Sequence, residues 1–377
     1  MYRIVLTGGG TAGHVWPLLV VAQELRKRAE CRFLYLGSAN SIERDLTAGV
    51  VPFEAIPVGK LRRYFDFKNL LDPFRVLAGY LKARELLRRF KPDLVLAKGG
   101  YVSLPVVLAA APEGVPIIIH ESDAVFGLAN KIAARHALFI LVGFPKKFYL
   151  PAEASAKVGD VPFTRKLIYT GIPVRSEFFH PTKSYLKQIG FDPRIKTLFV
   201  MGGSQGAHRI NYLISRIAGK LLERFQVIHV SGARDLEWLA GVRAKLPLYQ
   251  RKRYHLFSFF KREFPQALVA ADLVLSRSGA STLAELAAAS KPAILLPLAS
   301  SASGHQLKNA EIFAQAGAAQ MVDDHQISVQ ELFTSVEKIL GSEFRLRVMA
   351  NKMSLMAKPD AGIHIAKIIL EILRKKR

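Results

Sequence analysis

The chain has few acidic residues, a single cysteine and no long hydrophobic run. Its 377 residues include 30 Asp and Glu against 54 Lys and Arg, which gives a formal net charge of +24. The lone Cys31 excludes an internal disulfide framework and predicts a reducing, cytoplasmic setting. The longest apolar stretch, Val102 to Pro112, is too short to span a bilayer. Because residues 2–6 already have the pattern of a core strand, we expect a soluble protein without a leader sequence.

The excess of positive charge predicts an anionic partner, which nucleic acid, a phosphorylated ligand or an anionic membrane would each provide. The sequence contains no zinc-ligand spacing, no aromatic RNA-binding signature and no basic zipper, so a nucleic-acid partner is not expected. Histidines and carboxylates are scattered along the chain and form no metal-binding motif. We therefore expect no metal site and no cofactor, with stimulation by a divalent metal ion left open.

Two glycine-rich loops are the clearest local features. The first, Gly8 to Gly13, follows the apolar segment Arg3–Leu6, and the second, Gly202 to Gly206, follows Thr197–Met201. Such loops let backbone N–H groups approach a phosphate at the positive end of a helix. The first loop formally matches the G-x-G-x-x-G dinucleotide fingerprint. The second predicted strand ends at residues 36–40 without the acidic residue that would hold a ribose, which disfavours a nicotinamide or flavin cofactor.

Apolar strand patterns alternate with helical patterns in both halves of the chain. Two segments recur, since Asp93–Leu96 corresponds to Asp272–Leu275 and Pro116–Ile119 corresponds to Pro292–Leu295. Alternation of this kind is typical of parallel sheets covered by helices on both faces. We predict an α/β protein with two Rossmann-like, doubly wound parallel-sheet domains that face a cleft, over residues 1–170 and 171–342. The helical segment 343–377 could pack back across the boundary.

Polar side chains follow several predicted strands, at the edge where open sheets bind ligands. His14 directly follows the first glycine loop and precedes a helix expected around Pro17–Arg28, with Pro17 in its first turn. This histidine is a candidate general base, and a capping or packing role is the alternative. Thr282 and Glu285 have the spacing of a capping box; the alternative is that Glu285 accepts hydrogen bonds from a sugar.

The segment from Lys68 to Arg89 has the pattern of an amphipathic helix. Apolar residues recur in it at helical spacing, and six basic residues outnumber two acidic ones. Such a face either packs on a core or lies against an anionic membrane, and the pattern alone does not decide between the two. The candidate membrane contacts are Leu70, Phe74, Arg75 and Leu77.

Taken together, these motifs resemble the MurG-type transferases of bacterial cell-wall synthesis over essentially the whole chain. That family has the two-domain GT-B architecture. It transfers N-acetylglucosamine (GlcNAc) from UDP-GlcNAc to the 4-hydroxyl of the muramyl sugar of lipid I, with inversion at the anomeric carbon, and the product is lipid II. The resemblance rests on Gly8 to His14 with Pro17, Gly99–Ser103, His120-Glu121, Gly127-Leu128 with Asn130-Lys131, Pro173-Val174-Arg175, Gly202–Ala207, Arg277–Ala280 with Glu285, and Gln306 with Asn309.

The resemblance implies roles for the matching residues. In the second half, Glu285 would bind the ribose hydroxyls, Gln306 the GlcNAc, and Lys261 the uracil through its backbone. In the first half, His14 or Glu121 would be the catalytic base. The other implied substrate contacts are Thr11, Ala12, Gly13, Asp123, Asn130, Arg175, Ser204, Gln205, Ala280, Ser281, Thr282, Leu283, Ala284 and Asn309.

The same resemblance implies UDP-GlcNAc and lipid I as substrates. It also places the protein peripherally on the cytoplasmic face of the inner membrane, and so favours the membrane alternative for residues 68–89. The family usually has two glutamines at His305-Gln306, His-Glu-Gln-Asn at His120 to Asp123, and asparagine at Ile172. We expect these departures to change substrate contacts more than the class of reaction. The alternatives are another GT-B enzyme, such as a glycolipid glycosyltransferase or a UDP-GlcNAc epimerase, and a basic nucleic-acid-binding protein.

Overall fold

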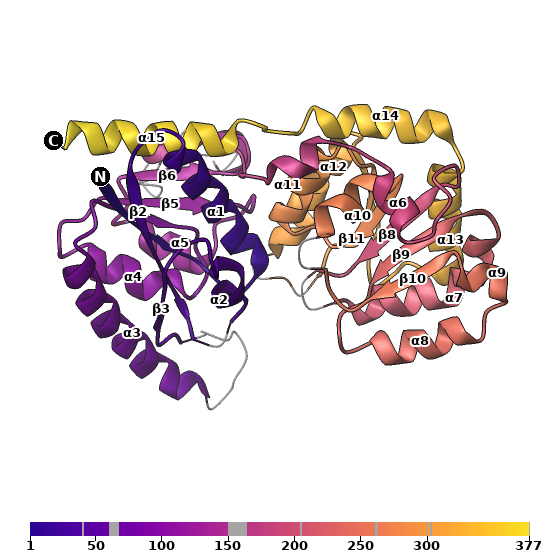
Figure 1. Cartoon of the computed structure of the whole chain (residues 1–377), viewed down its shortest axis with the longest axis horizontal. Helices are drawn as coiled ribbons and strands as arrows, with labels where there is room; N and C mark the ends of the chain where they lie inside the picture. The colour runs from indigo at the N-terminus through magenta and orange to yellow at the C-terminus, as the bar shows by residue number, and fades with distance from the viewer. Residues whose placement is uncertain are drawn as a thin grey trace. The chain divides into compact units, whose positions relative to one another are not determined.

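The computed structural model describes residues 1–39, 41–59, 68–149, 164–203, 206–260, 263–299, 301 and 304–376, without the side chains of residues 68–71 and 164. The chain forms two compact units, each with its own sheet (Figure 1). The first unit contains Met1–Val174 and Lys358–Arg377, and the second contains Arg175–Ala357. Among the described residues, no helix is both long and apolar enough to cross a membrane.

The first unit is built on a parallel seven-stranded sheet. Ile4 and Leu6 of β1 (Tyr2–Thr7) face one core and Val5 faces the other, because successive side chains of a strand point to opposite faces. The chain first adds strands on one side of β1 and then on the other, beginning with β4 (Leu94–Ala97). Open α/β sheets bind ligands at such a reversal. The order is β3 (Phe53–Ile56), β2 (Cys31–Ser38), β1, β4, β5 (Ile117–Glu121), β6 (Phe139–Val142), β7 (Leu167–Tyr169).

Helices cover both faces of this sheet. On one face, α1 (Ala12–Arg26) and α15 (Ala361–Lys375) pack together and close the core around Ile4 and Leu6, although they lie at opposite ends of the chain (Figure 1). The short helix α2 (Ile42–Thr47) packs beside α1. The opposite face is covered by α3 (Lys68–Phe90), α4 (Ser103–Ala110) and α5 (Leu128–Ala133).

The second unit repeats this design with a parallel six-stranded sheet. Its strand order is β10 (Tyr254–Phe257), β9 (Gln226–Val230), β8 (Thr197–Met201), β11 (Leu273–Ser276), β12 (Ala293–Leu295), β13 (Ala319–Met321). The helices are α6 (Ser184–Gln188), α7 (His208–Arg224), α8 (Leu236–Ala244), α9 (Leu248–Arg251), α10 (Phe264–Ala270), α11 (Ala280–Ala288), α12 (His305–Gln315), α13 (Val329–Leu340) and α14 (Glu343–Ser354). Three short 3₁₀ helices are also described: η1 (Lys146–Phe148) and η2 (Thr164–Lys166) belong to the first unit, and η3 (Ser176–Phe179) belongs to the second.

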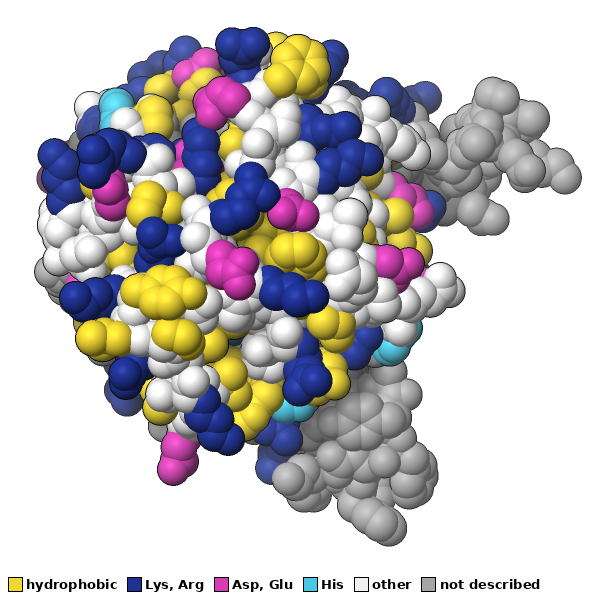
Figure 2. Space-filling view, turned by 90° about the vertical axis from the view of Figure 1, so that its right-hand side faces the viewer, with side chains coloured by type: hydrophobic (Ala, Val, Ile, Leu, Met, Phe, Trp, Pro, Cys, Tyr) yellow, Lys and Arg dark blue, Asp and Glu magenta, His cyan; other side chains and the backbone are white. Residues whose placement is uncertain are grey.

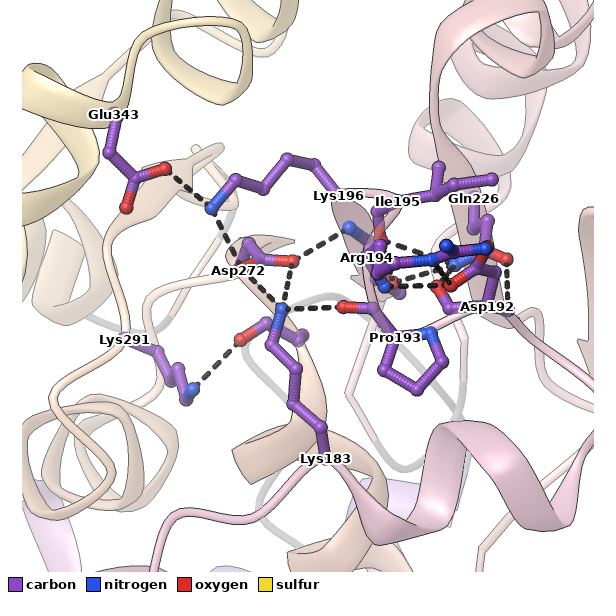
Figure 3. Close-up of polar contacts among 12 residues, drawn as sticks. Lys183, Asp192, Pro193, Arg194, Ile195, Lys196, Gln226, Asp272, Lys291 and Glu343 are labelled. Atoms are coloured by element: carbon purple, nitrogen blue, oxygen red, sulfur yellow. Dashed lines mark hydrogen bonds and ion pairs between the residues drawn. The ribbon is translucent and has the colours of Figure 1, made fainter.

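The segments that recur in the sequence have the same place in both sheets. Asp93 precedes β4, and its carboxylate accepts a hydrogen bond from the N–H of Arg3 at 2.7 Å. Asp272 precedes β11, and its carboxylate accepts from the N–H of Thr197 at 2.9 Å. Both aspartates thus tie the starts of two neighbouring central strands together. In the second unit Asp272 also pairs with Lys183 and Lys196, at 3.1 and 3.5 Å (Figure 3).

Several element boundaries differ from the sequence expectations. α1 begins at Ala12, directly after the first glycine loop, so Pro17 is the sixth helical residue and the expectation of a first-turn proline was wrong. Burial of neighbouring apolar side chains, such as Leu18 at 1 % exposure, offsets the backbone hydrogen bond that proline cannot donate. The segment after residue 342 forms two helices, of which α14 belongs to the second unit and α15 to the first. The chain passes between units at residues 174–175 and again at 357–358.

Candidate active site

At the carboxyl edge of the first sheet, two glycine loops pack directly against each other. Gly100 has φ +76°, and a Cβ there would lie 2.7 Å from the carbonyl oxygen of Gly9. Gly10 has φ +90°, and its position would bring a Cβ 3.1 Å from the ring of Tyr101. The hydroxyl of Tyr35 donates to the Gly8 carbonyl at 2.6 Å. Only residues without a side chain fit this contact, which explains the glycines in both loops.

Glu43 is a component of the first loop that the sequence analysis missed. It lies in α2, is fully buried, and accepts a hydrogen bond from the N–H of Gly10 at 2.6 Å. A carboxylate therefore occupies one of the backbone donors that a phosphate would otherwise bind. The sequence analysis found no acidic residue at positions 36–40, at the end of the second strand. Glu43 follows three positions later, and it binds the glycine loop itself.

His14 is the third residue of α1 and is partly exposed. Its Nδ1 lies 3.0 Å from the Thr11 hydroxyl oxygen. In the tautomer in which Nδ1–H donates to Thr11, the lone pair on Nε2 is the basic atom of the ring. The structure therefore orients the imidazole in a way that suits proton transfer.

Glu121, the other candidate base, has a different environment. It is 5 % exposed and accepts hydrogen bonds from the N–H groups of Asp123 and Gly127 and from the amide of Asn130, at 3.0, 2.9 and 3.0 Å. Burial and the charge of Asp123 raise the pKa of Glu121 to about 7. Its carboxylate organises the loop between β5 and α5, and the buried Asn130 supports it. Asp123 itself is partly exposed at this edge.

A buried lysine lies beneath these loops, and the sequence analysis did not single it out. Lys98, 2 % exposed, donates to Nδ1 of His120 at 2.8 Å and to the hydroxyl of Ser122. The Nε2–H of His120 donates to the carbonyl of Gly171 at 2.9 Å, so the ring is neutral. Burial lowers the pKa of Lys98 to about 8, although the charges of Glu121 and Asp123 oppose that shift. Ser122 and Asp123, which differ from the residues usual in the family, thus lie close to a buried lysine: Ser122 accepts its hydrogen bond, and the charge of Asp123 acts on its pKa.

In the second unit, the glycine loop after β8 leads into α7. A Cβ at Gly206, with φ +76°, would lie 2.4 Å from the carbonyl oxygen of Ser231, so the loop packs tightly on its neighbour. Ser204 and Gln205, which were expected to contact the donor, lie outside the described residues, and so does Lys261. The predicted contacts of these three residues therefore stay predictions.

A chain of hydrogen bonds runs from this loop into the core. His208, the first residue of α7, contacts Asp235 through Nδ1 at 3.0 Å, and the Asn211 amide donates to the same carboxylate at 2.7 Å. The Asn211 carbonyl oxygen lies 2.9 Å from Nε2 of His229, and Nδ1 of His229 lies 2.8 Å from the Tyr254 hydroxyl. Burial lowers the pKa of His229 to about 3, so that ring is neutral. No local motif predicted this network, because its members come from α7, β9, β10 and the residue before α8.

Glu285 lies on α11 rather than in a capping box. The helix begins at Ala280 with Gly279 as N-cap, which places Thr282 third and Glu285 sixth, so the capping-box alternative was wrong. The backbone N–H groups of Ala280 and its neighbours form the positive end of the helix. Burial raises the pKa of Glu285 to about 7, and the charge of Arg175 partly opposes that shift. Arg175 precedes η3, which packs on α11, and its guanidinium lies 5.1 Å from the ring centre of Phe178.

Hydrogen bonds join the first turns of α12 to the loop that follows β11. The Ser278 hydroxyl donates to the backbone carbonyl of Gln306 at 2.7 Å, and the Asn309 amide donates to the Ser278 carbonyl at 3.1 Å. The side-chain oxygen of Gln306 accepts from the N–H of Leu298 at 2.9 Å. Asn309 is fully buried, so its contribution is to hold the two loops together. Gln306 and Asn309, in the first turns of α12, are thus held against the loop that precedes α11.

The membrane candidates lie on α3, whose apolar stripe is exposed. Phe74, Leu77 and Leu81 are 70, 55 and 56 % exposed, so the alternative that this stripe packs in the core was wrong. Arg75 is 48 % exposed beside it, and its guanidinium lies 3.4 Å from the carboxylate of Asp72. The side chain of Leu70 lies outside the described residues. An exposed apolar stripe with basic neighbours is the pattern of a helix that lies on a lipid surface.

Comparisons with known proteins match both units. Residues 4–142 match the glycosyltransferase family 28 N-terminal domain, and residues 197–364 match the corresponding C-terminal domain. Similar proteins include two named UDP-N-acetylglucosamine–N-acetylmuramyl-(pentapeptide) pyrophosphoryl-undecaprenol N-acetylglucosamine transferase. The one from Lachnoclostridium phytofermentans is 39 % identical, with coverage of 91 % of this chain and 92 % of its own. The one from Clostridium botulinum is 36 % identical, with coverage of 100 and 99 %.

Solved structures with a similar fold include an enzyme of the same kind. The crystal structure of Acinetobacter baumannii MurG is similar with a TM-score of 0.72 and 26 % identity, over 98 % of this chain and 100 % of that one. A UDP-GlcNAc 2-epimerase from Neisseria meningitidis bound to UDP-GlcNAc has a TM-score of 0.66 over 100 % of both chains, but only 15 % identity. That second likeness shows a shared fold. The predicted architecture of two Rossmann-like, parallel-sheet domains is confirmed.

Proposed function

The chain belongs to glycosyltransferase family 28, and on this premise we infer that it transfers GlcNAc from UDP-GlcNAc to the muramyl sugar of lipid I and so forms lipid II. The observation that carries this conclusion is the 36 % identity to the Clostridium botulinum transferase over the full length of both proteins. The chain is therefore a hexosyltransferase, as its motifs predicted. The finer assignments that follow, of substrates to residues and of the protein to a membrane surface, are proposals.

The donor is assigned to the loops of the second unit. UDP is an anion, and the helix N-terminus at Ala280, together with the glycine loop before α7, offers backbone N–H groups to its diphosphate. Glu285 is one and a half turns further along α11, and its carboxylate accepts hydrogen bonds from the ribose hydroxyls in this proposal. Arg175 adds a positive charge for the departing UDP. These groups supply the electrostatic stabilisation of the leaving group, and no metal ion or cofactor has a role in the proposed mechanism.

The acceptor is assigned to the loops of the first unit, with His14 as the base that removes the proton from the 4-hydroxyl. His14 is partly exposed and its Nδ1 contacts Thr11, which leaves Nε2 as the proton acceptor. Glu121 is the weaker candidate because three N–H donors surround its buried carboxylate. A direct displacement with one base inverts the anomeric carbon, since the hydroxyl attacks opposite the departing diphosphate.

Membrane attachment is assigned to α3. The lipid-linked acceptor is held in a bilayer, and the stripe of Phe74, Leu77 and Leu81 offers apolar area beside basic side chains. We place the protein on the cytoplasmic face of the plasma membrane as a peripheral enzyme. Nucleic acid has no part in this proposal.

Label transfer tests the function. The purified protein is incubated with radiolabelled UDP-GlcNAc, with and without a lipid I analogue. We expect label in the lipid only when the acceptor is present. Conversion of UDP-GlcNAc without acceptor would instead indicate an epimerase, the activity named for the structural neighbour from Neisseria meningitidis. Absence of both reactions, with UDP-GlcNAc still raising the melting temperature, would contradict the acceptor assignment and leave the donor site.

A further inference from the structure

The outer side of α14 carries an apolar stripe that no part of the proposed reaction uses. On its inner side, Leu346 and Met353 are buried, and the helix packs against α13 and α11. On its outer side, Phe344, Val348 and Leu355 are 67, 40 and 76 % exposed. Their spacing of four and then seven residues places them on one line along the helix. The second unit therefore presents a narrow row of apolar side chains to solvent.

Basic residues flank this row on both sides. Arg345 and Lys352 lie along one side of the row and Arg347 along the other, and all three are exposed. The only acidic residue of α14, Glu343, is paired with Lys196 at 2.6 Å (Figure 3). Basic side chains also lie among apolar ones across the face of the second unit that Figure 2 shows. The surface around the row is thus complementary to an anionic partner.

The shape of the row favours lipid over protein. A stable protein interface buries about 800 Å² on each side and has few charges at its centre. Three side chains in single file, with cations directly beside them, do not provide such a centre. A helix lying in a membrane surface has this arrangement, with apolar side chains inserted and Lys and Arg at the headgroups.

The same arrangement occurs on α3 of the first unit. There Phe74 and Leu77 are exposed beside Arg75, as Phe344 and Val348 are exposed beside Arg345. A contact of this size gives weak, reversible attachment to a membrane surface.

We propose that the outer side of α14 is a second lipid-contact surface, which inserts Phe344, Val348 and Leu355 among anionic phospholipids while its Arg and Lys side chains bind their headgroups. The proposal extends the membrane attachment in the proposed function, and rests on it, but does not depend on the transferase chemistry.

Vesicle binding tests the proposal. The full chain and its Phe344→Ser/Val348→Ser/Leu355→Ser variant are sedimented with vesicles of phosphatidylglycerol and phosphatidylcholine, and with phosphatidylcholine alone. We expect the variant to bind the anionic vesicles at least about tenfold more weakly, with an unchanged melting temperature because the side chains are exposed. The matched control is Leu248→Ser/Tyr249→Ser on α9, which removes residues that are 63 and 54 % exposed away from the row. Equal binding by the α14 variant and the parent, or an equal loss in the control, would overturn the proposal.

A reporter on the row tests contact directly. Asn351 lies between Val348 and Leu355 on the same side of α14, and Cys31 is the only cysteine, so Asn351→Cys in a Cys31→Ser background accepts one environment-sensitive fluorophore. We expect its emission to increase with anionic vesicles and not with phosphatidylcholine alone. Unchanged emission while the protein binds vesicles would show that α14 stays in water. Vesicle binding lost only in an α3 variant would refute this inference and keep the proposed function, whereas a failed label transfer would refute that function regardless of vesicle binding.

Discussion

At the scale of single residues, ionisable groups with displaced pKa values lie at both carboxyl edges. Glu121 and Lys98 lie under the first sheet's loops, and Glu285 lies on the helix that follows β11. Each has a pKa displaced by burial toward neutral pH, where small changes of environment alter its charge. Such displacement is common at sites that bind charged ligands, and it makes substitutions of Glu285 and Lys98 informative.

His14→Ala should lower kcat far more than it weakens UDP-GlcNAc binding. The base acts on the acceptor hydroxyl in the transition state, and a positioned general base typically contributes about 10²–10⁴-fold. The measurements are steady-state kinetics with a lipid I analogue and donor binding by calorimetry. An unchanged kcat would return His14 to a packing role beside Thr11.

Glu285→Gln should weaken donor binding and remove its pH dependence. The pKa of Glu285 is raised to about 7, so the carboxylate that we propose as the acceptor for the ribose hydroxyls forms as pH increases through that value. In the parent enzyme, UDP-GlcNAc affinity should therefore increase from about pH 6 to about pH 8, while the Gln variant stays flat and weak. Calorimetry at several pH values measures this. A parallel pH profile in both proteins would mean that another group titrates.

Lys98→Met should make the stability of the first unit less dependent on pH, and it also removes two hydrogen bonds. The folded state loses the Lys98 proton near pH 8 and the unfolded chain keeps it to 10.5. Between these values the unfolded state binds more protons, so stability contributed at this site increases with pH, by up to about 3 kcal/mol.

Unfolding of the two proteins as a function of pH measures this difference. Each unit contains one tryptophan, Trp16 in the first and Trp238 in the second, so Trp238→Phe makes fluorescence report the first unit alone. We expect the difference in unfolding free energy between parent and variant to change between about pH 8 and pH 10. A constant difference would show that Lys98 is uncharged or solvated in the folded protein.

At the scale of elements, two features stand out: the close packing of two glycine loops, and the division of α3 into a buried part and an exposed part. The loops after β1 and β4 approach so closely that Gly9 and Gly100 are in backbone contact. α3 buries Leu86 and Leu87 near its end while Phe74 and Leu77 near its start remain in solvent. One helix therefore stabilises the core with its last turns and is available for lipid with its first described turns.

Phe74→Ser/Leu77→Ser should weaken binding to anionic vesicles without loss of stability. These side chains are 70 and 55 % exposed, so their replacement removes area that would insert into lipid and none that packs in the core. Vesicle sedimentation and thermal unfolding are the two measurements. Vesicle binding as strong as that of the parent would contradict attachment through α3, and a large drop in melting temperature would mean that the stripe packs against protein.

At the scale of the whole molecule, the chain leaves the first unit, folds a second one, and returns to complete the first. α15 contributes Ile365, Ile369 and Leu370, each at most 4 % exposed, to the same core as α1 and β1. The first unit therefore depends on residues more than 180 positions beyond Val174. The last helix of the chain is thus a structural part of the first domain.

Ile369→Ala should destabilise the first unit by about 2–5 kcal/mol and leave the second unchanged. Ile369 is fully buried against the core of the first unit, whereas Lys367 on the outer side of α15 is exposed, so Lys367→Ala is the matched control. Fluorescence of Trp16 and of Trp238, recorded separately in variants that keep one tryptophan, follows each unit. A loss shared equally by both units would indicate that they unfold as one, contrary to this assignment of α15.

The amino-acid sequence by itself determined the features that depend on neighbouring residues. Strand periodicity, the glycine loops and the recurrence of Asp93 and Asp272 are local patterns, and from them the two parallel-sheet domains could be predicted. The class of reaction followed from the resemblance of the ordered motifs to a known family. The start of α1 could not, because burial of its apolar face outweighs the preference of Pro17 for a first turn. The same limit applies to Thr282 and Glu285, whose spacing suits a cap that the helix start at Ala280 rules out.

Only the tertiary structure decided which distant residues meet. Glu43 binds the N–H of Gly10, Lys98 binds His120, and α15 completes the core beneath α1. The tertiary structure also decided that the apolar stripes of α3 and α14 are exposed, because an amphipathic sequence pattern is the same whether its apolar side faces a core or solvent. Folding selects among such alternatives by the total burial and hydrogen bonding of the whole chain, which no short stretch of sequence contains.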